Sequence, residues 1–156
     1  MICNYIEFTD IRETFIDYKK VGLYVSGTKC NLNCKMCFND NLKHSPTIKI
    51  NPLSFVENYI IKNQIIESVI FSGLNWFDKF EDLVRLITCI RIYTNIDIVI
   101  YTGYKESELL KEIEILKEYS NIIVKFGEYI PNDNSIFDET LGITLSSSNQ
   151  YAKKIS

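Results

Sequence analysis

Four short apolar runs recur along the chain, at residues 21–25, 68–71, 97–101 and 121–125. Runs of this length that stop at small or turn-forming residues are typical of strands buried in a sheet. A glycine stands two residues after each run: Gly27, Gly73, Gly103 and Gly127. The pattern therefore predicts four buried strands with glycine close to each carboxyl end.

Between these runs the spacing of apolar residues changes to that of a helix. Asn51 and Pro52 are typical of a helix start, with Asn as the cap and Pro in the first turn. The residues that follow place an apolar stripe on one face: Phe55, Val56, Tyr59 and Ile60. A longer stripe predicts a helix over residues 80–93, through Phe80, Leu83, Val84, Ile87, Ile90 and Tyr93. A third helix is predicted over residues 106–119, through Leu109, Leu110, Ile113 and Leu116.

Strands that alternate with helices predict right-handed βαβ units, and hence an α/β fold with a mostly parallel sheet. Four or five such units are too few for a closed eight-stranded barrel, so we expect an open partial (β/α) barrel. Residues 1–20 show no regular spacing of apolar residues. We expect them to be an N-terminal segment before the sheet, with one short strand. Residues 131–156 are polar and rich in turn-forming residues.

Composition narrows the class of protein. The chain has 156 residues, of which 46% are hydrophobic, as expected for one packed domain over residues 1–156. Its net charge of −3 provides no broad basic surface, so we expect no nucleic-acid partner. The sequence has no apolar run of membrane-spanning length and shows no leader at its start. We therefore expect a cytoplasmic protein with no membrane contact.

Three of the five cysteines, Cys30, Cys34 and Cys37, share one short polar segment with Cys-x3-Cys-x2-Cys spacing. Thiolates favour iron–sulfur clusters and zinc over harder cations. Three ligands leave one position of a cluster open to an outside molecule, whereas electron-transfer clusters are usually closed by four cysteines. The alternative is a structural zinc site with His44 or Asp40 as its fourth ligand.

The position of this segment favours a ligand site. It directly follows the first predicted strand, and ligands of parallel sheets bind beyond the carboxyl ends of the strands. The four glycines are predicted at the same edge. The remaining cysteines have simpler interpretations, because Cys89 falls in the apolar stripe of a helix and Cys3 has no evident partner.

Taken together, these motifs resemble the radical S-adenosylmethionine (SAM) superfamily. The closest likeness is to the glycyl-radical activating enzymes, specifically the activating component of anaerobic (class III) ribonucleoside-triphosphate reductase. Around the three cysteines, the spacing of the family signature is kept at Lys20, Tyr24, Gly27 and Asn39. Two later segments resemble further family motifs: residues 101–104 (Tyr-Thr-Gly-Tyr) and residues 147–150 (Ser-Ser-Asn-Gln).

The resemblance implies that Cys30, Cys34 and Cys37 hold a 4Fe-4S cluster and that SAM binds its open iron. The residues that it implies for SAM binding are Met36, Asn39, Ser72, Gly73, Tyr101, Thr102 and Gly103. A flavodoxin- or ferredoxin-type donor would reduce the cluster, and the large reductase subunit would receive the glycyl radical. The chemistry lies in the cofactors, so no side chain is expected to act as a general acid or base.

The sequence also departs from the family pattern. The family usually has Gly-Gly-Glu-Pro after the second strand, where it holds the amino group of SAM. Here Gly73 is followed by Leu74, Asn75 and Trp76. Met36 replaces the aromatic residue that commonly packs on adenine, and Tyr18 stands where the signature has glycine.

Two other functions remain open at this point. A radical SAM enzyme could act on another protein or on a small molecule. A metal-containing binding module could have lost SAM chemistry, and the altered segment at residues 74–76 is the feature that favours this alternative.

Overall fold

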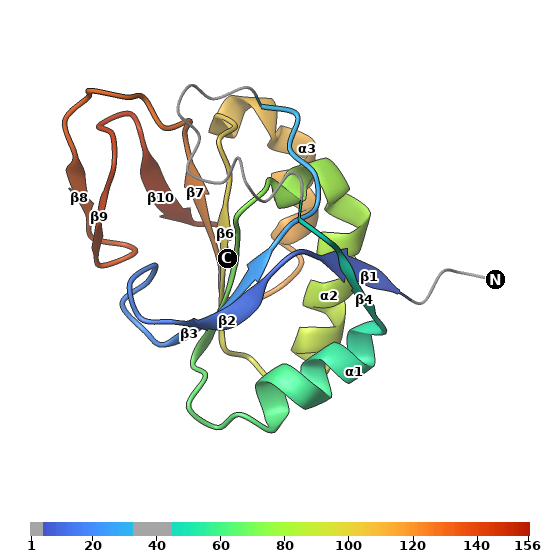
Figure 1. Cartoon of the computed structure of the whole chain (residues 1–156). Coiled ribbons are helices and arrows are strands. Elements are labelled where there is room, and N and C mark those ends of the chain that lie inside the picture. Colours follow the sequence, from blue (N-terminus) through green and yellow to red (C-terminus); the bar gives the residue numbers. More distant parts are fainter. Residues whose placement is uncertain (1–4, 33–44) are drawn as a thin grey trace.

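The computed structural model describes residues 5–32 and 45–156 of the chain. It is a mixed α/β fold (Figure 1). Its strands are β1 (Ile6–Phe8), β2 (Ile11–Thr14), β3 (Gly22–Ser26), β4 (Ile48–Ile50), β5 (Ser68–Ser72), β6 (Asp97–Tyr101), β7 (Ile122–Phe126), β8 (Ile136–Asp138), β9 (Ile143–Leu145) and β10 (Tyr151–Lys154). Its α-helices are α1 (Pro52–Val56), α2 (Phe80–Tyr93) and α3 (Leu110–Leu116).

The central sheet keeps the order of the chain. Its strands lie in the order β2, β3, β5, β6, β7 and β10, so each one pairs with the preceding strand of the same sheet. The inner pairs β3–β5, β5–β6 and β6–β7 are parallel, and the two outer pairs are antiparallel. In the described part of the chain the sheet is open, with β2 and β10 as its edges.

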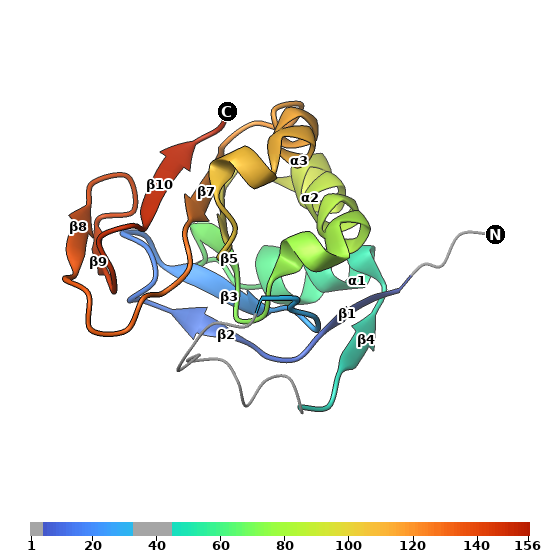
Figure 2. The same ribbon diagram turned by 90° about the horizontal axis from the view of Figure 1, so that it is seen from above.

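Successive parallel strands added in one direction place their connecting helices on the same face of the sheet, because such crossovers are right-handed. Figure 2 shows α1, α2 and α3 together on one side of the sheet and the β8–β9 hairpin on the other. The side chains of alternate strand residues form the core beneath the helices: Leu23, Val25, Val69, Phe71, Ile98, Ile100, Ile122, Val124 and Phe126. All of these side chains are buried.

The opposite face, here called the open face, is covered without helices. Ile70, Val99 and Ile123 point to this side, and they pack against a second apolar cluster that includes Tyr18 and Leu141. The loop between β2 and β3 joins the segment before β9 through the hydrogen bond from Lys19 N to Leu141 O, at 2.8 Å. The loop between β2 and β3 and the β8–β9 hairpin therefore cover the open face.

Most of the predicted elements are confirmed. The four buried strands are β3, β5, β6 and β7, and the helix over residues 80–93 is α2. Asn51 caps α1 through its side-chain oxygen, which accepts hydrogen bonds from Leu53 N at 2.9 Å and Ser54 N at 3.4 Å. The predicted helix over residues 106–119 is shorter, because a 3-10 turn (Glu106–Glu108) precedes α3.

The pattern missed the short strands. The N-terminal segment contains two strands, β1 and β2, where one was expected, and the polar C-terminal segment contains β8, β9 and β10. Each has three or four residues, which is too short for a reliable period. Among the described residues, none of the helices has the length and apolar character needed to cross a membrane.

Candidate functional site

A cavity of about 330 Å³ lies at the carboxyl edge of the parallel strands, on the open face. It brings together residues that follow β3, β5, β6 and β7, as expected for a ligand site in a parallel sheet. The C-terminal segment closes one side through residues 143–146 and Gln150. The loop before β3 contributes Ile16 and Asp17.

Six of the predicted site residues line this cavity: Cys30, Ser72, Gly73, Tyr101, Thr102 and Gly103. They come from three separate segments of the sequence. The other four, Cys34, Met36, Cys37 and Asn39, lie outside the described residues. The cluster and SAM contacts assigned to all ten stay predictions.

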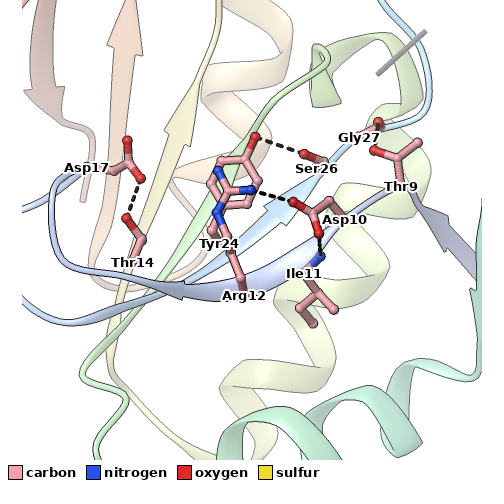
Figure 3. Close-up of polar contacts among 9 residues, drawn as sticks. All are labelled: Thr9, Asp10, Ile11, Arg12, Thr14, Asp17, Tyr24, Ser26 and Gly27. Carbon is pink, nitrogen blue, oxygen red and sulfur yellow. Dashed lines mark hydrogen bonds and ion pairs between the residues drawn. The ribbon is translucent and has the colours of Figure 1, made fainter. Parts of the chain in front are cut away.

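Hydrogen bonds from two sides hold the backbone that leads into the cysteine segment. Ser26 N donates to Asp10 O at 2.9 Å and Thr9 N donates to Ser26 O at 3.0 Å. Thr9 Oγ1 donates to Gly27 O at 3.0 Å, as Figure 3 shows. From the other side, Gly27 N donates to Ser72 O at 3.2 Å. The turn between β1 and β2 therefore fixes where the chain leaves β3.

The tyrosine of the family signature lies beside this exit. Tyr24 is buried, and its phenol oxygen accepts a hydrogen bond from Ser26 Oγ at 2.9 Å. The Arg12 guanidinium lies 4.3 Å from the centre of the Tyr24 ring and is held by Asp10 (Figure 3). Burial is the main reason that the pKa of Tyr24 is raised. Tyr24 is therefore a neutral, well-packed support of the strand end.

Asp78 connects the cysteine segment to the ends of β5 and β6. Its Oδ2 accepts a hydrogen bond from Asn31 N at 2.7 Å, one residue after Cys30. Its Oδ1 accepts a hydrogen bond from Tyr104 Oη at 2.7 Å. The hydrogen bond to Asp78 is the main cause that raises the pKa of Tyr104 to about 12. One carboxylate thus fixes the first cysteine relative to both neighbouring loops.

Gly73 is required at the end of β5 for conformational and steric reasons. Its φ of 74° lies in the left-handed region, where side chains are rarely tolerated. An added Cβ would also collide with Ser26 Oγ and approach Tyr24 Oη within 2.9 Å. The backbone of β5 can therefore lie close to β3 at the cavity wall.

The segment that replaces the family motif is well ordered by packing. Trp76 is 1% exposed, and its indole nitrogen donates to Val25 O at 3.0 Å. Its ring lies 5.1 Å from that of Phe71 in an edge-to-face arrangement. Trp76 is therefore part of the core beneath the helices.

A buried lysine lies on the wall of the cavity. Lys125 is 7% exposed and points to the open face, between Ile123 and the end of β7. Its ammonium group donates to Gly127 O at 3.1 Å and lies 5.4 Å from the centre of the Tyr101 ring. Burial raises the pKa of Tyr101, whose hydroxyl donates to Asp17 O at 2.5 Å. The cavity wall therefore places the Lys125 amine beside one neutral phenol, that of Tyr101.

The C-terminal motif completes the wall near β7. Gln150 is buried, and its amide bridges Ser147 N at 3.2 Å and Gly127 O at 3.2 Å. Gly127 has a φ of 103°, and an added Cβ would lie 3.1 Å from Asn149 O. Residues 147–150 therefore hold the backbone after β7 in place. This segment, which resembles a family motif, has a structural role here.

Sequence reasoning missed three residues of the site: Asn75, Asp78 and Lys125. Lys125 could have been found, because it is the charged residue in an otherwise apolar strand, and it lies on the same side of the strand as Ile123. Asp78 and Asn75 have no such signal. Their contacts to Asn31, Thr102 and Tyr104 join residues that are at least 26 positions apart.

The residues present fit a bound cofactor. Cys30, a half-buried free cysteine, lies at the cavity, and thiolates suit an iron–sulfur cluster. Among the described residues, Asn75 Nδ2 is a buried donor without a hydrogen-bond partner. A buried polar atom of this kind is rare in proteins unless a ligand or water satisfies it.

Comparison with known proteins gives one match. A family described as "4Fe-4S single cluster domain" matches residues 19–152, which is most of the chain. No curated protein matches the chain, and no solved structure does.

Proposed function

The chain belongs to the 4Fe-4S single cluster domain family, and we propose that it is a radical SAM activating enzyme. Its proposed substrate is the large subunit of an anaerobic ribonucleotide reductase, on which it generates a glycyl radical. A flavodoxin- or ferredoxin-type protein in the cytoplasm is the proposed electron donor. The open sheet, with helices on one face only, is proposed to be a partial (β/α) barrel.

One observation carries the proposal. Cys30, the Ser72–Gly73 pair and residues 101–103 are far apart in sequence, yet they line the same cavity. These are segments that resemble the cluster and SAM motifs of the activating enzymes. A structural metal site would use only the cysteine segment, whereas a cofactor bound in this cavity would contact all three segments.

Different residues would have different roles in binding the cluster and SAM. Cys30, Cys34 and Cys37 would hold the cluster, and Asp78 would fix the first of them through Asn31 N. When bound and reduced, the cluster supplies the electron that cleaves SAM and so starts hydrogen abstraction from a glycine. Lys125 would face an anionic group of SAM. Tyr101 and Thr102 would form the wall that keeps water from the reacting atoms.

A second cavity supports a protein substrate. It has a volume of about 840 Å³ and shares Leu32, Gly103, Gly127 and Glu128 with the first. Its outer wall includes Leu110 and Ile130, whose side chains are 63% and 46% exposed. An extended segment of a partner could lie there and present its glycine to the first cavity.

The test uses protein reconstituted with iron and sulfide under anaerobic conditions and reduced with dithionite. We expect cleavage of SAM to 5′-deoxyadenosine and methionine, and a glycyl radical signal in electron paramagnetic resonance when the large subunit is added. Cys30→Ser should lose the cluster and both signals. Cys89→Ser is the matched control, because Cys89 lies on α2, partly buried against the core, and does not line the cavity. A reduced, cluster-loaded protein that leaves SAM intact would contradict the proposal.

A binding module without SAM chemistry is the second candidate, favoured by the packing of residues 74–76. Trp76 is part of the core, so this segment has a structural reason to differ from the family motif. Metal analysis of protein purified without oxygen separates the two functions. Zinc without iron would favour the binding module, whereas about four irons per chain would be compatible with both, and SAM cleavage would then decide.

A further inference from the structure

Asn75 occupies a central place in the wall of the cavity. It lies three residues after Ser72, directly before the 3-10 turn Trp76–Lys79, and its side chain is 5% exposed. It lines the same cavity as Cys30 and Gly73. Its amide is therefore shielded from bulk water while the residue borders a space large enough for a ligand.

The hydrogen bonds of the amide oxygen fix how the amide is oriented. Asn75 Oδ1 accepts from Phe77 N at 3.2 Å and from Thr102 Oγ1 at 3.1 Å. Thr102 Oγ1 itself accepts from Tyr104 N at 3.1 Å, so its hydroxyl hydrogen is available for Asn75. Exchanging the amide oxygen and nitrogen would place an N–H group against the N–H of Phe77. The amide therefore has one stable orientation.

This orientation leaves the amide nitrogen without a partner in the described part of the chain. An amide nitrogen has two N–H donors and cannot accept a hydrogen bond. Buried donors are nearly always paired in folded proteins, so an unpaired one at a cavity points to a group that binds there. That group must supply a hydrogen-bond acceptor.

We propose that Asn75 Nδ2 binds a carboxylate oxygen of the ligand in this cavity, which makes Asn75 a specificity-determining residue for an amino-acid moiety. The buried ammonium group of Lys125 on the same cavity wall favours an anionic acceptor over a neutral one. The identification of this ligand as SAM rests on the proposed function. An ammonium group has only donors and could not pair with Asn75 Nδ2.

The altered segment at residues 74–76 would therefore take part in ligand binding. Where the family usually has an acidic motif that holds the amino group of SAM, this chain has an amide whose oxygen is already used within the protein. Only the N–H groups of the amide nitrogen remain available to a ligand. Asn75 would therefore bind the carboxylate side of SAM and leave the amino group to backbone carbonyl groups.

The test compares two ligands and uses reconstituted, cluster-containing protein. The ligands are SAM and decarboxylated SAM, and equilibrium dialysis measures their dissociation constants. Asn75→Asp keeps the capping oxygen and the size of the side chain but replaces the donor with an acceptor. We expect its loss of affinity to be about tenfold or more greater for SAM than for decarboxylated SAM.

Two further variants make the test independent of folding defects. Asn75→Ser keeps a capping oxygen without the amide and should show the same ligand-dependent loss in a milder form. Asn51→Ala removes an equivalent cap from α1, away from the cavity, and should change neither dissociation constant by more than about twofold. Circular dichroism confirms that each variant is folded.

The outcomes separate the two proposals. Equal losses for both ligands in Asn75→Asp and Asn75→Ser, or no loss, would overturn the inference and leave the proposed function standing. Wild-type protein that carries the cluster but does not bind SAM would overturn the proposed function, and the ligand assigned to Asn75 with it. A loss confined to SAM supports both.

Discussion

The two faces of the central sheet differ in what covers them and in what they do. Beneath the helices, alternate strand residues are aliphatic or aromatic and form one continuous apolar core. On the open face, the same strands present Tyr24, Tyr101 and Lys125, and the cover consists of a loop and a hairpin. Adjacent residues of one strand therefore serve different purposes, because their side chains alternate between the two faces.

The molecule thereby places most of its stability on one face and its ligand site on the other. The helix-covered face supplies buried apolar area, which is the dominant favourable term in folding. On the open face, polar groups border a cavity instead of packing against other side chains. They therefore contribute less to stability than core residues do. Substitutions on the first face should therefore change the free energy of unfolding most, and those on the second should change mainly the site.

The largest effect is expected from Phe71→Ala. Phe71 is fully buried beneath the helices and contacts Trp76. We expect the free energy of unfolding to fall by about 3–5 kcal/mol, because a large core side chain is lost and a cavity remains. Urea denaturation measures this change. Phe137→Ala is the matched control, since Phe137 is 60% exposed, and it should change the value by less than about 0.5 kcal/mol.

The next effect is expected from Asp78→Ala at the carboxyl edge. It leaves Asn31 N and Tyr104 Oη without their acceptor, so we expect a loss of about 1–2 kcal/mol in the free energy of unfolding. It should also speed the loss of iron to a chelator, because the segment after Cys30 is released. Tyr104→Phe removes only one of the two hydrogen bonds and should retain iron nearly as well as wild type. Equal iron loss in both variants would contradict the role of Asn31.

A smaller effect is expected from Tyr101→Phe on the open face. The substitution removes the hydrogen bond to Asp17 O and leaves the ring in place, so the expected loss is about 1 kcal/mol. Thermal unfolding measures it. A loss as large as that of Phe71→Ala would show that the two faces contribute equally to stability.

The smallest effect concerns alkaline pH. The pKa of Tyr104 is about 12 in the folded protein, mainly because its hydroxyl donates to Asp78, and about 10 in the unfolded chain. The folded state holds this proton more tightly, so the contribution is complete below pH ~10 and is lost as the pH rises through about 12. The difference in stability between wild type and Tyr104→Phe should therefore shrink across this window. A constant difference would contradict the hydrogen bond.

The helix-covered face was the predictable one. Its helices show an apolar stripe long enough to detect, and α2 begins and ends where the spacing of Phe80 to Tyr93 predicts. Asn51 and Pro52 predicted the start of α1 because capping depends on adjacent residues. In each case the information is local in the sequence.

The open face could be predicted only in part. Short apolar runs and glycines indicated that Gly73 and Gly103 meet at one edge, because parallel strands share that edge, and the family resemblance added Ser72 and Thr102. The hairpin β8–β9 and strand β10 have no comparable signal, and the roles of Asn75 and Asp78 depend on partners distant in sequence. Such long-range hydrogen bonds become visible only when the chain is folded.

The strands of the central sheet lie side by side in the order in which the chain is synthesised. Each new strand of the central sheet can dock on its predecessor as soon as it is made, which keeps loop closures short. The cavity does not share this advantage, because its wall extends from Ile16 to Gln150. A growing chain would thus complete most of its scaffold early, while the pocket around Cys30 would stay unfinished until Gln150 has emerged.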